Sequence, residues 1–149
     1  MPGETHLTTL LHSMQPELQT DTFVFCTLPT QADKTLPVDP IGLFREGEGL
    51  TLIVTKAEAI AQGWPYTYEC RQITLTVHSS LAAVGFLAAI THALAIAGIS
   101  VNPVSAYYHD HLFVPAEQAQ AALNCLLALT TAQGSTSSEV ARNWDPEAR

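Results

Sequence analysis

The second half of the chain alternates between extended and helical patterns in an order that few folds accommodate. Ile73, Leu75 and Val77 alternate with threonines, which is the period-two pattern of a strand with one buried face. An apolar helical stretch follows at 79–98, then extended segments at 100–108 and 111–115, and an alanine-rich helix at 116–131. With one further strand, this order is the βαββαβ motif of ferredoxin-like folds. We therefore expect an α+β fold with an antiparallel sheet and helices on one face.

Single residues support this arrangement. Pro103 cannot donate to a neighbouring strand, so it indicates an edge strand, and the second strand of βαββαβ lies at an edge. Ser79 or Ser80 is a suitable N-cap for the first helix, and Gly98 is suited to its C-terminal end.

The first half repeats part of this pattern. Residues 50–59 (LTLIVTKAEA) and 110–119 (DHLFVPAEQA), 60 positions apart, both read as a strand that leads into a helix. A strand is expected at 22–28, a hairpin at 41–54 and a short helix at 56–63 that Gly63 ends. The proline-rich stretch 29–40 predicts a loop in place of the first crossover helix, and a helix at 5–14 is expected to cover that face of the sheet instead.

Composition excludes several classes of partner. The net charge is −8 and the six basic residues are scattered, which excludes nucleic acid and anionic membrane surfaces. No apolar run reaches the length of about 18 residues that spans a bilayer, and the N-terminus has no basic signal region. Three cysteines without a CxxC pair suggest buried, reduced thiols. These features predict a cytoplasmic protein.

The segment ITLTVHSSLAAVGFLAAITHALAIAGISVNPVSAYYHDHLFVP resembles bacterial proteins that carry two tandem ACT modules in one short chain. FVFCTLP and PIGLFREGEGLTLIV resemble their N-terminal module, and a more distant similarity links the chain to the cytosolic arginine sensors of animals. The resemblance implies two ferredoxin-like ACT modules in tandem. We place them at residues 1–68, in degenerate form, and 69–132, followed by a polar tail at 133–149.

The resemblance also implies a ligand site where the first strand of a module passes into its first helix. The matching residues are His78, Ser79, Ser80, Leu81, Val84, Gly85 and Phe86, with Ile99, Ser100 and Asn102 at the next strand. A helix N-terminus with free N–H groups independently suits a carboxylate. Many ligand-binding ACT domains have an acidic residue and Pro-Gly before this helix. VHSSL has neither, so the resemblance does not identify the residue that would bind a ligand's amino group.

The stretch YYHDH has three interpretations. His109, Asp110 and His111 are of the types that bind metal, although a closed zinc site needs about four ligands. The stretch also occupies the position of EGEG in the first half, which predicts a hairpin turn or a module interface. Contact with a ligand is the third interpretation.

No catalytic motif such as GxSxG, a P-loop or HExxH is present, so we expect no enzyme and no cofactor. The expected function is a regulatory module that senses an amino acid or a related metabolite. It is expected to act as a homodimer and to signal through an unknown effector protein. The alternatives are an interaction module without a ligand and a metal-binding protein.

Overall fold

A computed structural model describes residue 3 and residues 5–132. The predicted tail at 133–149 lies outside the described residues. In chain order the elements are α1 (Leu7–Ser13), β1 (Pro16–Leu28), the 3₁₀ helix η1 (Thr30–Thr35), β2 (Gly42–Arg45), β3 (Leu50–Thr55), α2 (Lys56–Gln62), β4 (Thr67–Leu75), α3 (Phe86–Ile96), β5 (Asn102–Ser105), β6 (Asp110–Pro115), the 3₁₀ helix η2 (Ala116–Gln118) and α4 (Ala119–Thr131).

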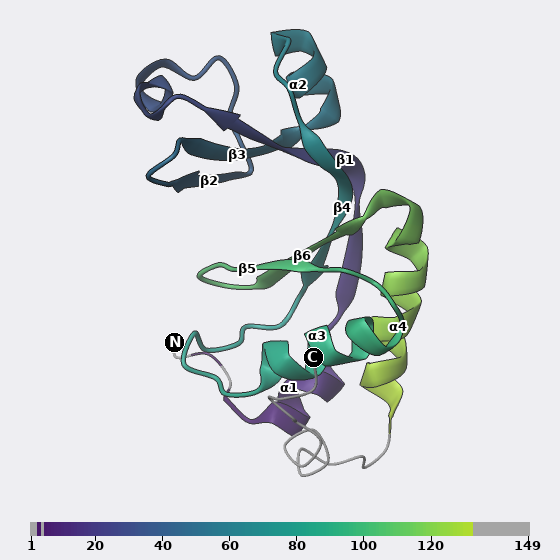
Figure 1. The fold of residues 1–149 in the computed structure, drawn as a ribbon. Helices are drawn as coiled ribbons and strands as arrows, with labels where there is room; N and C mark the ends of the chain where they lie inside the picture. Colours follow the sequence, from purple (N-terminus) through teal and green to yellow (C-terminus); the bar gives the residue numbers. More distant parts are fainter. Residues whose placement is uncertain (1–2, 4, 133–149) are drawn as a thin grey trace, which may run out of the picture.

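The six strands form one antiparallel sheet in the order β2-β3-β1-β4-β6-β5. Its central pair, β1 and β4, are the first strands of the two modules. The order β2-β3-β1-β4 is a complete four-stranded ferredoxin-like sheet, and so is β1-β4-β6-β5. Each module therefore takes its missing fourth strand from the other. This confirms the α+β class and the tandem modules, and it joins them in one curled sheet (Figure 1).

The internal repeat corresponds to real structural elements. The bounds of β2 and β5 differ by 60 residues at both ends, and so do those of β3 and β6. Strands β3 and β6 also have the same alternation of buried and partly buried positions. Strand β5, with Pro103, lies at one edge of the sheet as expected. The domain boundary between residues 68 and 69 stays a prediction, and it falls within β4 (Thr67–Leu75), a strand that both four-stranded sheets include.

Two helix ends also agree with the sequence. Gly63 and Gly98 end α2 and α3 in the left-handed conformation, at φ 66° and 71°. At the start of α2, Thr55 and Glu58 form a capping box, in which each side chain bonds the backbone N–H of the other residue.

Three elements differ from the sequence-based expectation. Strand β1 begins at Pro16 and not at residue 22, because its polar first half pairs with the end of β4. Residues 30–35 of the expected loop form η1. Helix α1 does not cover the N-terminal part of the sheet: Leu10 and Met14 are buried in a core shared with α3, α4, β4 and β6.

The two faces of the sheet bury different residues. On the face that the helices cover, one core surrounds Ile73, Leu75 and Ile90, and a smaller one surrounds Val24 and Leu52. On the opposite, concave face lie Phe23, Ile53, Cys70 and Phe113. The Phe23 and Phe113 rings meet edge to face with centroids 6.0 Å apart. The curl of the sheet packs these residues against one another and buries them.

Among the described residues, no helix is long and apolar enough to cross a membrane.

The position of α1 can be tested with Leu10→Ala. Leu10 is fully buried, so the loss of its side chain should lower the free energy of unfolding by about 2–5 kcal/mol. Amides of α3 and α4 should lose protection from hydrogen exchange before those of α2. Ile96→Ala, on the exposed surface of α3, is the control and should change stability by less than about 0.5 kcal/mol. Loss of protection in α2 instead would contradict this packing.

Candidate functional site

The helix expected from Ser79 begins only at Phe86. Its N-cap is Gly85, with φ at 90°. A helix cannot continue through a residue with this positive φ, which glycine adopts without steric cost, so the helix begins after it. The expected cap by Ser79 or Ser80 is therefore wrong. The Ser80 hydroxyl instead accepts the N–H of Ala82 at 3.1 Å, within a turn that precedes the helix.

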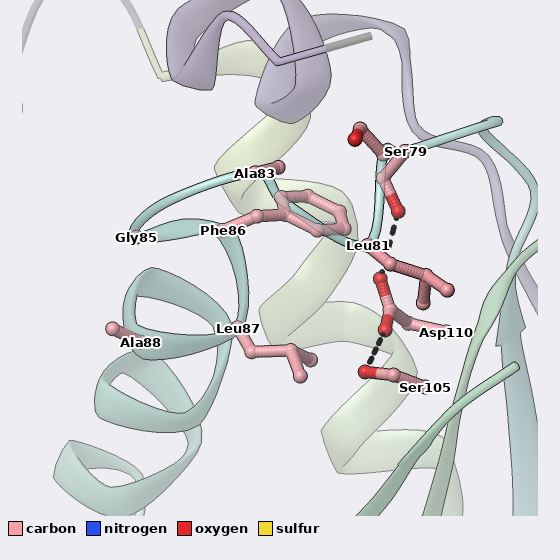
Figure 2. A pocket seen from close by; sticks show the side chains of 10 residues that line it. Ser79, Leu81, Ala83, Gly85, Phe86, Leu87, Ala88, Ser105 and Asp110 are labelled. Atoms are coloured by element: carbon pink, nitrogen blue, oxygen red, sulfur yellow. Dashed lines mark hydrogen bonds between the residues drawn. The ribbon is translucent and has the colours of Figure 1, made fainter. Parts of the chain in front are cut away.

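The loop between β4 and α3 lies against the hairpin β5–β6. Asp110, the first residue of β6, is only 6% exposed and accepts hydrogen bonds from two hydroxyls. Ser79 Oγ donates to Oδ2 at 3.0 Å, and Ser105 Oγ donates to Oδ1 at 2.6 Å. Figure 2 shows the carboxylate between the two serines. Hydrogen bonds from two hydroxyls suit a carboxylate in its charged form, since they replace part of its water shell.

A pocket of about 140 Å³ opens beside this carboxylate (Figure 2). One side is the first turn of α3, where the first intrahelical bond runs from Ala89 N–H to Gly85 C=O. The amides of Phe86, Leu87 and Ala88 precede that bond, so the helix itself provides them with no acceptor. The pocket thus combines partial positive charge at the helix end with a buried negative charge on Asp110. The lining residues are Ser79, Ser80, Leu81, Ala83, Gly85, Phe86, Leu87, Ala88, Ser105 and Asp110.

Five of the ten predicted ligand-site residues line this pocket: Ser79, Ser80, Leu81, Gly85 and Phe86. The other five lie elsewhere. The ring of His78 lies against Tyr108, and the Val84 side chain is 87% exposed. Ile99 belongs to the core. Ser100 Oγ lies 3.4 Å from the Tyr68 hydroxyl, and Asn102 pairs with Phe113 in the sheet. Whether the residues at the pocket bind a ligand stays a prediction.

Ligand contact was one of three interpretations of YYHDH, which includes Asp110, but the sequence did not place Asp110 or Ser105 beside the residues of VHSSL. Asp110 and Ser105 come from the next two strands of the module and are a directly opposed pair in the β5–β6 hairpin. The 60-residue repeat carries part of the signal, because it relates the two hairpins position by position: Arg45 pairs with Leu50 as Ser105 pairs with Asp110. The sequence did not show that this hairpin lies close to Ser79.

The three metal candidates do not converge. Asp110 is held by serines, His109 Nδ1 lies 3.2 Å from the carbonyl of Val77, and His111 Nδ1 bonds Gln72 and Thr74. Across residue 3 and residues 5–132, no group of three or more His, Cys, Asp or Glu side chains is placed to hold a metal ion. His109 lies in the turn, while Asp110 and His111 are consecutive in β6 and point to opposite faces of the sheet.

The environment of His111 affects its protonation. Burial lowers the pKa of His111 below its ordinary value of 6.5, His109 lowers it further, and Asp110 partly opposes both effects. Below pH 6.5 the unfolded chain therefore binds a proton at this site more readily than the folded protein does. Stability contributed by a neutral His111 is fully present above that pH and is lost as the pH falls.

We expect the free energy of unfolding to fall between pH 7 and pH 5, and to fall less in a His111→Gln variant. Urea denaturation at a series of pH values measures this difference. His92→Gln, on the exposed surface of α3, is the matched control. An equal acid loss in the wild type and His111→Gln would contradict the expected effect.

Comparisons with known proteins identify related sequences and folds. Models of the ACT domain match residues 2–71 and residues 67–128. A crystal structure of a Vibrio cholerae protein of unknown function, described as a possible transport protein, is 45% identical, with a TM-score of 0.77; the alignment covers 84% of this chain and 96% of that one. Among curated proteins, none matches the chain.

More distant structures share the fold alone. An Agrobacterium tumefaciens protein aligns with 16% identity and a TM-score of 0.64, over 78% of this chain and 89% of that one. The regulatory subunit of aspartate kinase from Thermus flavus aligns with 14% identity and a TM-score of 0.55, over 76% of this chain and 95% of that one.

Proposed function

The chain belongs to the ACT-domain family, whose members are typically regulatory modules that bind small molecules, and we propose that it binds a small, neutral α-amino acid. The proposed site is the pocket between the N-terminus of α3 and Asp110. The observation that carries the proposal is the pairing, in one pocket, of a buried carboxylate with first-turn amides to which helix α3 itself offers no acceptor.

The two ends of this pocket match the two charges of a zwitterion. The carboxylate of an amino acid would bind at the first-turn amides of α3, where the helix dipole favours negative charge. The ammonium group would donate to Asp110, whose oxygens keep unused lone pairs after accepting from Ser79 and Ser105. The acidic residue that the VHSSL loop lacks is thus supplied by β6.

The rest of the lining favours an uncharged ligand side chain. The apolar lining residues are Leu81, Ala83, Phe86 and Leu87. Of the described residues that line the pocket, Asp110 is the one with an ionisable side chain. An additional charge on the ligand would therefore lose water without gaining a partner. The volume of about 140 Å³ favours the smaller amino acids.

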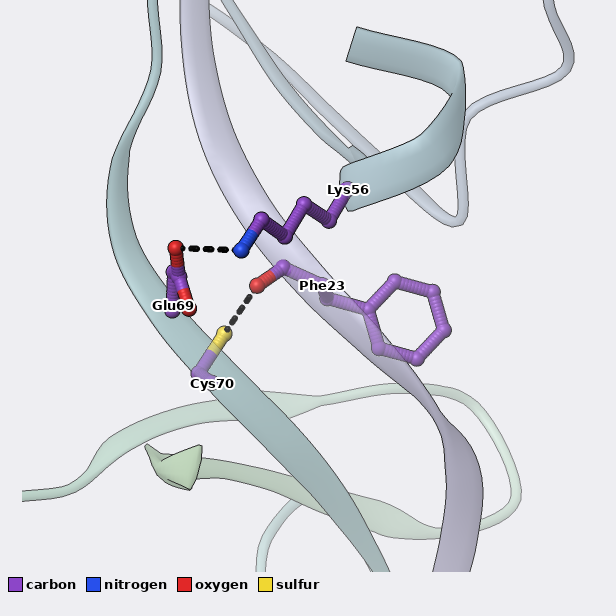
Figure 3. A network of polar contacts seen from close by, with 4 residues as sticks. All are labelled: Phe23, Lys56, Glu69 and Cys70. Carbon is purple, nitrogen blue, oxygen red and sulfur yellow. Dashed lines mark hydrogen bonds and ion pairs between the residues drawn. The ribbon is translucent and has the colours of Figure 1, made fainter. Parts of the chain in front are cut away.

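A regulatory role without catalysis is supported by the state of the cysteines. Burial raises the pKa of Cys70 to about 12 and also raises that of Cys26, so neither forms the thiolate that nucleophilic catalysis needs. The Cys70 thiol donates to the carbonyl of Phe23 at 3.3 Å, within the β1–β4 seam (Figure 3). Near it, Lys56 and Glu69 form an ion pair at 2.7 Å that links α2 to β4.

The proposed output is a change in the arrangement of subunits. In a homodimer in the cytoplasm, a ligand that binds one arrangement better than another shifts the population toward it, and an effector protein would read that shift. Of the two sheet edges, β2 is the better candidate for pairing with a second copy, because Pro103 removes a donor from β5.

The test is thermal melting of the protein with each of the twenty amino acids. A ligand at about 100 times its dissociation constant should add about 2.7 kcal/mol to the free energy of unfolding. We expect one or a few small neutral amino acids to raise the melting temperature. If none does so at millimolar concentration, the proposal fails and an interaction module without a ligand becomes the better interpretation.

Two variants locate the site. Asp110→Asn removes the charge that the ammonium group needs and should abolish the ligand-induced shift, whereas Asp21→Asn, at an exposed position of β1, should leave it unchanged. Ala88→Glu places a negative charge in the first turn of α3. It should maintain or raise the stability of the free protein while weakening binding, which separates loss of the site from loss of the fold. Unchanged binding in both Asp110→Asn and Ala88→Glu would contradict the assigned site.

A further inference from the structure

A second pocket lies on the concave face of the sheet, away from the helices. It is a groove of about 190 Å³ between the hairpins β2–β3 and β5–β6, which project to the same side of the central β1–β4 pair (Figure 1). Its walls are mostly apolar, formed by Ile41, Ile53, Val104, Ala106 and Phe113. Ile53 and Phe113 belong to the core of the concave face, so the floor of the groove is fixed by packing.

Two polar side chains, Gln72 and His111, also line the groove. Gln72 is only 6% exposed, and its amide nitrogen lies 3.0 Å from His111 Nδ1 and 3.4 Å from Thr74 Oγ1. Thr74 Oγ1 lies 3.1 Å from the same ring nitrogen. Because an amide nitrogen only donates, Nδ1 accepts, and the proton of the neutral ring is on Nε2.

This network leaves one donor and one acceptor unused. Within the described part of the chain, the Gln72 carbonyl oxygen and His111 Nε2–H make no hydrogen bond. No buried side-chain nitrogen or oxygen among the described residues lacks a partner, so these two unused groups are accessible from the groove, where water or a ligand can bond them. Side chains held by such a network are also oriented before a ligand arrives.

The groove is also electrically neutral. Among the described residues that line it, His111 alone can ionise, and burial lowers its pKa, which favours the uncharged ring at neutral pH. A charged ligand would therefore find no counter-charge here, in contrast to the pocket at Asp110.

We propose that this groove is a second binding site, for a neutral and largely apolar molecule with an amide-like edge. The ligand carbonyl would accept from His111 Nε2–H, and a ligand N–H would donate to the Gln72 carbonyl. An apolar cavity of about 150 Å³ holds a benzene molecule, so this groove suits a ligand of about six to eight non-hydrogen atoms. The site does not use α3 or Asp110, and it is independent of the function proposed for that pocket.

The probe is isovaleramide, which has a branched apolar body and a primary amide. In ¹⁵N-labelled wild-type protein it should shift the backbone signals of Val104 and Ala106 and the side-chain amide of Gln72, with saturation at millimolar concentration. Methyl isobutyl ketone has the same shape but no N–H, so it should bind about tenfold more weakly. Equal affinity for the two compounds, or shifts centred on residues 79–88 instead, would overturn the proposal.

The matched variants are Val104→Glu and Leu127→Glu. Val104 is 42% exposed at the wall of the groove, and Leu127 is 44% exposed on α4. Val104→Glu should weaken isovaleramide binding at least about tenfold with little loss of stability, because the new carboxylate occupies the groove. Leu127→Glu should leave binding unchanged. Wild-type affinity in Val104→Glu would refute the site.

Discussion

The antiparallel pairing of β1 with β4 is the interaction on which the rest of the molecule depends. Each strand is the first of its own module and the fourth of the other, so neither four-stranded sheet exists without the second module. Separating the modules would expose two long strand edges, which proteins avoid because such edges pair with other chains. The shared pair also explains why the sheet curls as one body, with helices outside and an aromatic cluster within the curl.

Two pockets in the described part of the chain differ in chemistry, and β6 contributes to both. Asp110 points toward α3 and brings a charge to the pocket there, while His111 points toward the concave groove. Consecutive strand residues face opposite sides of a sheet, so YYHDH cannot gather its three ligand-type side chains around one ion. The segment is a hairpin turn that supplies side chains to two separate pockets.

Part of the candidate site was predictable and part was not. VHSSLAAVG was expected to form a ligand site, and several of its residues line a pocket, because the end of a module's first strand and the start of its helix are close along the chain. Whether that pocket binds a ligand stays a prediction. The helix start was predicted six or seven residues too early, since Ser79 and Ser80 are good caps by type and Gly85 was expected to lie within the helix. A positive φ at Gly85 depends on how the loop crosses the sheet, which local propensity does not contain.

The sequence by itself determined most of the segments that become strands and helices, the strand that lies at an edge, and the hairpin plan that the two halves share. These properties depend on periodicity, on proline and glycine, and on a repeat of 60 residues, all of which are local or directly comparable along the chain. Only the tertiary structure decided that the modules exchange their fourth strands, that α1 packs with the C-terminal core, and that Asp110 meets Ser79. Those outcomes depend on contacts between residues distant in the chain, whose energies arise only once the sheet has formed.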